Sequence, residues 1–182
     1  MFVSAFDASF ESRRKLLAVA RERFAYAETL EDIVALVRST ARAIFSADGV
    51  TFVLRDGGKC HYVDEDAIGP LWKGQKFPME SCISGWCMLN GKTAAIEDIF
   101  ADPRIPHDVY RRTFVKSLIM APVGRETPVA AIGAYWSERR LFVQKEIGMV
   151  EALAGVVAEA MEQAQGPDGV MGKLPSLCLR RG

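Results

Sequence analysis

The amino-acid sequence predicts an α+β fold, in which a central antiparallel β-sheet carries the N- and C-terminal helices on one face. Short helices and loops then cover a pocket on the other face. Three observations predict this fold class. Two apolar runs flank a polar turn in residues 117–136, amphipathic helical patterns occupy both ends of the chain, and short turns separate consecutive strand-like segments. Consecutive strands that are joined by short turns pair in antiparallel fashion.

Residues 117–136 are the most strand-like part of the chain and are predicted to form a β-hairpin at the centre of the sheet. Side chains of a strand alternate between its two faces. Leu118 and Met120 therefore share one face, whereas Ile119 and Ala121 share the other. Neither set is polar, so other parts of the chain must cover both faces of the hairpin.

Two amphipathic helices are predicted before the sheet. Apolar residues at helical spacing predict the first over residues 10–27. The second follows Thr29, a residue suited to cap a helix, and carries a long apolar stripe. On this basis we assign residues 1–28 to an N-terminal helix, residues 29–165 to a single domain and residues 166–182 to a flexible C-terminal tail.

The middle of the chain alternates short strands with irregular segments. A hairpin is predicted from residues 50–55 and 59–64, because Asp-Gly-Gly at 56–58 is a turn sequence. Residues 65–78 are interrupted by Gly and Pro and are predicted to be irregular. Periodicity and turn residues predict the remaining pieces, which are a helix at 81–89, a strand at 93–96, a helical segment at 108–114 and a long helix at 143–165.

Composition narrows the classes of function. The chain has 182 residues, of which 23 are basic and 23 acidic, and this balanced charge argues against a nucleic-acid or membrane partner. No apolar run reaches the roughly 18 residues of a spanning helix, and the N-terminus has no export signal. We therefore expect a cytoplasmic protein whose four cysteines are reduced.

Three segments carry a resemblance to a known family. They are G-W-C-M-L-N-G-K-T-A-A-I-E-D-I at 85–99, P-H-D-V-Y-R-R-T-F-V-K-S-L-I-M-A-P-V at 106–123, and V-A-A-I-G-A-Y-W-S at 129–137 followed by a long apolar helix. In their order and spacing the sequence resembles the GAF domain family of small-molecule sensor modules, over about residues 29–165. It is similar to GAF domains that accompany PAS domains and histidine kinases in bacteria. The resemblance implies a regulatory role and a buried cavity, but it names no ligand.

Candidate ligand-binding residues are aromatic, sulfur-containing or imidazole side chains in the middle of the chain. They are Trp72, Trp86, Cys87, His107, Tyr110, Phe114, Met120 and Tyr135. His107 and Tyr110 are similar to the bilin-binding stretch of phytochrome GAF domains, but Pro106 stands where that family has its cysteine. Covalent bilin attachment is thus not expected there. A non-covalent planar ligand and an ordinary helix-start histidine both stay open for His107, as do stacking and core packing for the aromatic residues.

The cysteines offer a second line of interpretation. Cys60 and His61 spell a bilin-type pair, but neighbours on a strand face opposite ways and cannot line one cavity. Cys82 and Cys87 would lie roughly 140° apart on a helix, which is poor for zinc. Cys87 falls near one cysteine of free methionine-R-sulfoxide reductase, a GAF enzyme, yet residues 109–112 lack its catalytic cysteine. Buried apolar thiols are the simpler interpretation.

We therefore expect a non-catalytic GAF sensor domain that binds a small molecule in signal transduction. The sequence identifies no cofactor. A homodimer through the terminal helices and a signalling partner such as a histidine kinase are the expected assemblies. The alternatives are a reductase-like thiol enzyme, which would be active through Cys87, and a purely structural dimerisation module without a ligand.

Overall fold

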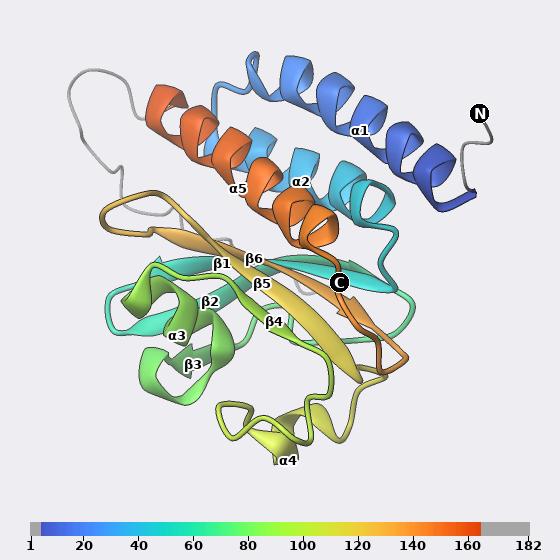
Figure 1. Cartoon of the computed structure of the whole chain (residues 1–182). Coiled ribbons are helices and arrows are strands. Elements are labelled where there is room, and N and C mark those ends of the chain that lie inside the picture. Colours follow the sequence, from blue (N-terminus) through green and yellow to red (C-terminus); the bar gives the residue numbers. More distant parts are fainter. Residues whose placement is uncertain (1–4, 165–182) are drawn as a thin grey trace, which may run out of the picture.

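The computed structural model describes residues 5–164, with side chains from residue 8 onward, so the tail predicted at 166–182 lies outside the described residues. A single sheet separates a layer of helices from a layer of short elements (Figure 1). The elements in chain order are α1 (Ala5–Phe24), α2 (Leu30–Phe45), β1 (Gly49–Asp56), β2 (Lys59–Ala67), β3 (Lys76–Pro78), the 3₁₀-helix η1 (Met79–Ser81), α3 (Ile83–Asn90), β4 (Ala94–Ile96), α4 (His107–Tyr110), β5 (Ser117–Val123), β6 (Ala130–Trp136) and α5 (Gln144–Ala164).

The sheet has six strands in the order β3-β2-β1-β6-β5-β4, and all its pairs are antiparallel. The central pair joins β1 to β6, with Thr51 opposite Gly133. The predicted hairpin is β5-β6, and its turn includes Gly124 with a positive φ of 105°. Both edge strands have only three residues, which limits the exposed edge available for pairing with other chains. The α+β class and the antiparallel sheet are thus confirmed.

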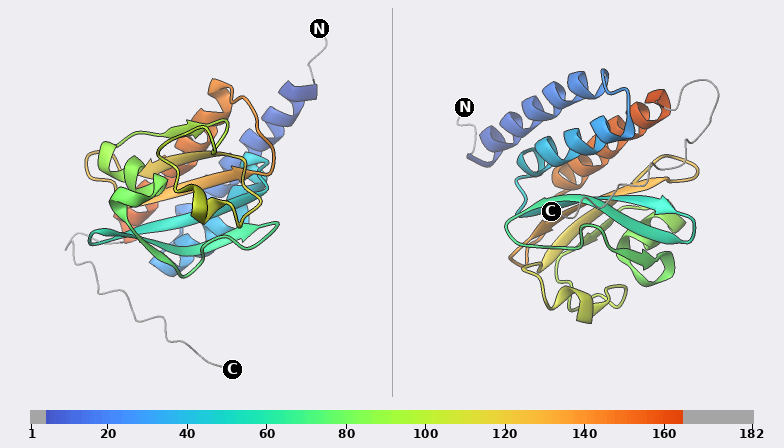
Figure 2. Two further views of the ribbon diagram at one scale, coloured as in Figure 1. Left: turned by 90° about the horizontal axis from the view of Figure 1, so that it is seen from below. Right: turned by 180° about the vertical axis from the view of Figure 1, so that it is seen from behind.

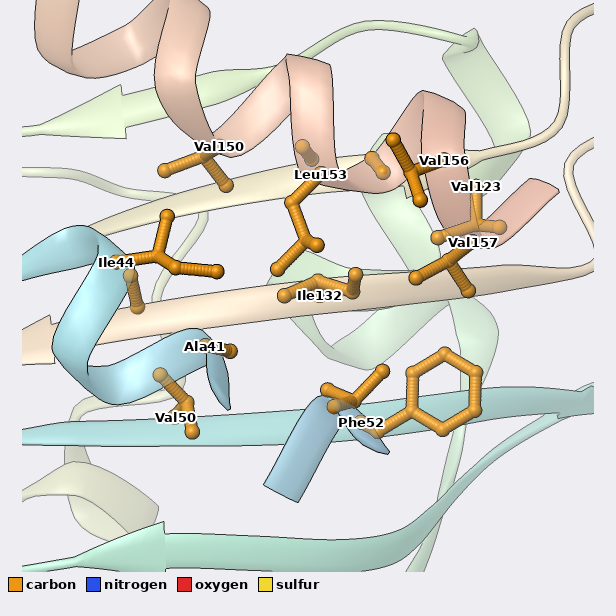
Figure 3. Packing of buried hydrophobic residues seen from close by; sticks show 14 of the residues in the cluster. Ala41, Ile44, Val50, Phe52, Val123, Ile132, Val150, Leu153, Val156 and Val157 are labelled. Carbon is orange, nitrogen blue, oxygen red and sulfur yellow. The ribbon is translucent and has the colours of Figure 1, made fainter. Parts of the chain in front are cut away.

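Helices α2 and α5 cover one face of the sheet. Their apolar stripes meet the side chains of β1, β5 and β6 in a continuous core (Figure 3). Residues labelled in that view are Ala41, Ile44, Val50, Phe52, Val123, Ile132, Val150, Leu153, Val156 and Val157. Helix α1 packs on α2 and α5, on their side away from the sheet (Figure 2). No helix among residues 5–164 has the length and apolar character that crossing a bilayer requires.

The start of α2 follows from its sequence. Thr29 accepts a hydrogen bond from the backbone N–H of Asp32 at 3.1 Å, and the Asp32 carboxylate accepts one from the backbone N–H of Thr29 at 3.0 Å. This capping box satisfies amides that have no partner within the helix. The helix ends at Phe45, and the capping residue Ser46 takes a left-handed conformation with φ of 52°.

The end of α2 is tied to the end of β6. The indole N–H of Trp136 donates to the Ser46 carbonyl at 2.9 Å, and the backbone N–H of Asp48 donates to the Tyr135 carbonyl at 2.9 Å. The Asp48 carboxylate in turn accepts from the backbone N–H and the hydroxyl of Ser137, each at 2.7 Å. The helix layer and the central strand are therefore joined at this corner by polar contacts as well as by packing.

Two segments differ from the sequence-based prediction. Residues 65–78 were expected to be irregular, but β2 continues to Ala67 and β3 adds an edge strand that pairs with β2. The predicted helix at 108–114 is limited to α4, because Tyr110 O accepts from both the backbone N–H and the hydroxyl of Thr113 and thereby closes a turn. Both features depend on contacts that local periodicity does not report.

Candidate functional site

Four aromatic residues meet on the sheet face opposite α2 and α5. Trp72, in the connection between β2 and β3, has its ring centroid 4.6 Å from that of Tyr110, 5.5 Å from that of Tyr62 and 5.7 Å from that of Tyr135. All four side chains are buried. We call Tyr62, Trp72, Tyr110 and Tyr135 the aromatic cluster. Tilted and edge-to-face rings at such separations attract each other beyond the effect of simple burial.

The position of Tyr135 depends on a glycine two residues before it. A Cβ at Gly133 would lie 2.4 Å from the Tyr135 hydroxyl and 2.8 Å from the Met120 methyl group. The bare backbone therefore makes room for the tyrosine ring to fold back along its own strand. From there its hydroxyl reaches Thr51 Oγ1 at 2.8 Å, on the neighbouring strand β1.

The loop that carries Trp72 is held by one carboxylate. Glu65 accepts hydrogen bonds from the backbone N–H groups of Leu71, Trp72 and Lys73, at distances of 2.8–2.9 Å. Hydrogen bonds to a charged acceptor are stronger than neutral ones. These hydrogen bonds satisfy three backbone N–H groups of the irregular segment, and they hold the Trp72 indole over the cluster.

The three phenol groups of the cluster differ in their hydrogen bonding. Tyr62 pairs with Ser84 Oγ at 3.0 Å and Tyr135 pairs with Thr51, whereas the buried Tyr110 hydroxyl has no partner among the described residues. Burial raises the pKa of Tyr62 and Tyr110 well above the ordinary value of 10. The phenols are thus neutral at physiological pH, and Tyr110 presents a hydrogen-bond donor with no acceptor.

A cavity of about 420 Å³ lies beside the cluster, between the β2–β3 connection and α4. Its lining residues are Pro70, Leu71, Trp72, Gln75, Phe77, Asp108, Val109, Arg112 and Thr113. Trp72 belongs to both the cavity and the cluster. Asp108 and Arg112 contribute one charge of each sign to the lining, and the other lining residues are uncharged and mostly apolar. The cavity is within the size range of small-molecule sites.

A group of thiols and hydroxyls lies at the start of α3, where Cys82 is the residue before the helix. The Cys82 thiol donates a hydrogen bond to the Pro78 carbonyl at 3.5 Å and lies 3.3 Å from Ser84 Oγ. Cys87, one turn later, donates instead to the Met120 carbonyl at 3.3 Å. Burial raises the pKa of Cys87 to about 12, so this thiol is a poor nucleophile.

The structure brings four of the predicted site residues together. Trp72, Tyr110 and Tyr135 belong to the aromatic cluster, and the Met120 methyl group lies beside Gly133 and Tyr135. Met120 itself is fully buried. The cavity that accompanies this group opens beside α4 rather than against Met120, where the sequence had suggested a pocket.

The other predicted residues point elsewhere. The Trp86 ring lies under the Arg104 guanidinium at 4.4 Å and is only half-buried. His107 Nε2 pairs with the Asp102 carbonyl at 3.2 Å, within its own loop. Phe114 packs over Gly49, at the far end of β1. Cys87, as noted above, points toward β5. These four residues do not converge on one cavity.

Sequence reasoning missed Tyr62, Thr51 and Ser84. Alternation along β2 was the available signal, because it places Cys60 and Tyr62 on one face and His61 on the other. Cys60 and Tyr62 are indeed buried, whereas His61 is half-buried. No local pattern connects Tyr62 to Ser84, since their hydrogen bond depends on the path of the chain through β3 and η1.

Proteins of known structure that share this fold differ in function. Free methionine-R-sulfoxide reductase from Neisseria meningitidis superposes with a TM-score of 0.74 at 19% identity, covering 91% of this chain and 96% of that one. The GAF domain of a phosphoenolpyruvate-protein phosphotransferase from Coxiella burnetii gives 0.75 at 15%, covering 88% and 99%. The corresponding Acinetobacter domain gives 0.72 at 11%, covering 87% and 98%. No curated protein matches the sequence.

The expectation that this chain is not an enzyme is overturned by these comparisons. Free methionine-R-sulfoxide reductases from several organisms share its fold, so the fold that suggested a sensor also supports catalysis. Identities below 20% carry the fold and not the activity. The residues of the site must therefore decide between a sensor function and an enzymatic function for this chain.

The sequence itself settles the family. The family model for the GAF domain matches residues 27–162, which is well over half of the chain. The match spans the whole sheet, the elements that carry the aromatic cluster, and helices α2 and α5 almost to their ends. On this evidence the chain belongs to the GAF domain family.

Proposed function

We propose that this GAF domain binds a small molecule as a regulatory module in signal transduction, with the ligand contacting the aromatic cluster. The observation that carries the proposal is the buried Tyr110 hydroxyl, which has no partner among the described residues. A buried donor without an acceptor costs about 1–3 kcal/mol. A ligand with a hydrogen-bond acceptor beside an apolar or planar group would remove this cost.

The cavity beside Trp72 supports the same assignment. It joins a mostly apolar wall to the charges of Asp108 and Arg112, and it lies against α4, the element that carries Tyr110. A ligand bound here would lie against Trp72, which belongs to both the cavity and the aromatic cluster. Closer contact with Tyr110 requires a small adjustment of α4, which has a single turn and few backbone bonds to hold it.

Native mass spectrometry of protein purified from its own host tests the proposal. We expect a small molecule to co-purify with the wild-type chain and to be depleted in Tyr110→Phe, which removes only the hydroxyl. Tyr26→Phe is the control, since Tyr26 is exposed between α1 and α2 and lies outside the aromatic cluster. Equal occupancy in wild type and Tyr110→Phe would contradict the assigned site, and an empty wild-type protein would favour a purely structural module.

A thiol-dependent sulfoxide reductase is the second candidate, and the exposure of Cys82 favours it, since this thiol residue is 7% exposed whereas Cys60 and Cys87 are fully buried. Catalysis through Cys87 is not supported, because that thiol is buried and donates to Met120 O. The assay is release of free methionine from methionine sulfoxide with a thiol reductant. Turnover that is lost in Cys82→Ser but kept in Cys87→Ser would establish this function.

The proposed module works as a homodimer in the cytoplasm. Helix α1 exposes Leu16 and Val19 on its outer side, and these could pack against a second copy. Cys60, Cys82 and Cys87 are free thiols, in keeping with a reducing compartment. A signalling protein such as a histidine kinase is the proposed partner, and dimer geometry would be the property that ligand binding changes.

A further inference from the structure

A groove of about 440 Å³ lies between the C-terminal half of α5 and the turn that joins β5 to β6. Its lining residues are Pro122, Gly124, Arg125, Glu151, Ala154, Gly155, Ala158, Glu159 and Glu162. The apolar part of the lining on α5 consists of glycine and alanine, and a Cβ added at Gly155 would meet no atom within 4 Å. Small side chains on α5 therefore leave a space that the described residues do not fill.

The charges that line this groove are mostly negative. Glu151, Glu159 and Glu162 are exposed on α5, and Arg125 is the basic residue of the lining. Glu159 lies 3.5 Å from Arg21 of α1, whereas Glu151 and Glu162 form no ion pair with another residue in the described part of the chain. The groove therefore favours an occupant that combines basic and apolar residues.

The segment that follows α5 in the sequence has this composition. Residues 166–182, which lie outside the described residues, read G-P-D-G-V-M-G-K-L-P-S-L-C-L-R-R-G. The basic residues Lys173, Arg180 and Arg181 outnumber the single acidic residue Asp168, and apolar residues lie between them. Gly and Pro at 166–167 are typical of a helix end at which the chain changes direction. The sequence thus supplies a basic and apolar segment next to an acidic and apolar groove.

We propose that residues 170–181 fold back along α5 and bind in this groove, with their basic side chains next to Glu151 and Glu162. The length of the segment permits this path. Arg181 follows Ala164 by 17 residues, and an extended chain of that length reaches at most roughly 56 Å. Glu151 precedes Ala164 by 13 residues on the same helix, which is a rise of about 20 Å.

The bound segment covers a surface of α5 that other proteins would otherwise reach. Its attachment to the same helix gives it a high effective concentration at the groove, so that it competes well with a separate chain. Gly155 and Glu159 also line a neighbouring groove between α1 and α5, so the covered surface extends to the contact between these helices. A partner that docks on α5 must first displace the segment. This cover is independent of the ligand proposed for Tyr110.

The test places a nitroxide on Cys178 of the full chain and records the backbone amide NMR signals. Cys60, Cys82 and Cys87 are buried, so Cys178 is the site of labelling, and mass spectrometry verifies one label per chain. We expect the nitroxide to broaden the signals of the groove residues on α5 and in the β5–β6 turn. At roughly 1 M salt, where charges are screened within about 3 Å, this broadening should fall at least twofold in the unsubstituted chain.

Charge reversal identifies the groove as the binding site. Glu151→Lys combined with Glu162→Lys should reduce the broadening at least about twofold, because attraction to the basic residues becomes repulsion. Glu80→Lys combined with Glu97→Lys is the matched control, since it changes the net charge equally at exposed residues outside α5 and the β5–β6 turn, and it should leave the broadening unchanged. Circular dichroism checks that both variants are folded.

Two outcomes would refute the proposal. In the first, the broadening decreases evenly with distance from Ala164 and responds neither to salt nor to charge reversal, as expected for a segment that does not bind. In the second, chains that carry the nitroxide broaden the signals of isotope-labelled chains without it, which would show that the groove binds a second copy. For an intramolecular cover, such a mixture should show no broadening.

Discussion

At the scale of single residues, Gly133 decides whether the aromatic cluster can form. A Cβ there would overlap the Tyr135 hydroxyl at 2.4 Å, so the ring would have to leave its place and lose its bond to Thr51. We predict that Gly133→Ala lowers the free energy of unfolding by about 1–3 kcal/mol, the usual cost of overpacking a core. Urea denaturation with both far-UV circular dichroism and tyrosine fluorescence measures this change.

Gly148 is the matched control for that experiment. It lies in α5, and a Cβ added there meets no atom within 4 Å. Gly148→Ala should therefore stabilise the protein by roughly 0.5–1 kcal/mol, because alanine restricts the unfolded chain and favours helix. Equal effects of the two substitutions would mean that Tyr135 does not depend on the space at Gly133.

Asp48 gives a residue-scale prediction that depends on pH. The backbone N–H of Ser137, and then its hydroxyl, lower the pKa of Asp48 below its ordinary value of 3.8. The ionised carboxylate therefore stabilises the fold fully above the unfolded-state pKa, and this contribution is lost as the pH falls through the lower folded-state pKa. Asp48→Asn should cost on the order of 1 kcal/mol at pH 7, since the group is largely solvent-screened.

The difference between Asp48→Asn and wild type should shrink when unfolding is repeated below about pH 4. Thermal unfolding from pH 3 to pH 7 follows it directly. A difference that stays constant over this range would show that the ionised form of Asp48 has no special role at the junction of α2 and β6.

At the scale of elements, the connection between β2 and β3 is the segment most dependent on a single side chain. Glu65 accepts from three successive backbone N–H groups, at 71–73. Glu65→Gln replaces one acceptor oxygen by an amide that cannot accept. We predict a loss of about 1–3 kcal/mol and faster hydrogen exchange at residues 71–73, measured by mass spectrometry.

Glu126→Gln controls for the loss of one negative charge, because Glu126 is exposed in the β5–β6 turn. It should leave both stability and hydrogen exchange at 71–73 unchanged. Unaltered exchange in Glu65→Gln would instead show that the loop carrying Trp72 is held by its packing in the aromatic cluster.

Elements with a strong repeat were predictable from sequence, and elements made by long-range contacts were not. Helix α2 and the β5-β6 hairpin have local signals in their caps, their turn and their alternating side chains. The three-residue strand β3 has no such signal and exists because β2 offers it an edge. For the site, aromatic residues were found by type, but sequence could not place Trp86 under Arg104 or bring Ser84 to Tyr62.

At the scale of the whole molecule, helix α1 exposes apolar side chains that bear on the proposed homodimer. Leu16 and Val19 are 46% and 56% exposed, three residues apart on one side of this helix. If the proposed dimer forms through α1, light scattering should give about twice the 20.1 kDa of one chain. Val19→Glu should shift the protein to the monomer, because a buried unpaired charge at an interface is costly.

Ile68→Glu is the matched control for dimerisation, since Ile68 is also 56% exposed but follows β2, far along the chain from α1. It should leave the molecular mass unchanged. A monomeric wild-type protein at micromolar concentration would remove α1 as a dimer interface and leave it as a cover for α2 and α5.

Tyr135 and Trp136 are consecutive residues that belong to opposite sides of the sheet. The phenol of the first stands among the aromatic rings, while the indole of the second is bound to Ser46, where α2 ends. A displacement of one residue necessarily carries the other, since a single peptide unit joins them. The fluorescence of Trp136 should therefore respond to a disturbance of the aromatic cluster, at a point where the sheet is hydrogen-bonded to the end of α2.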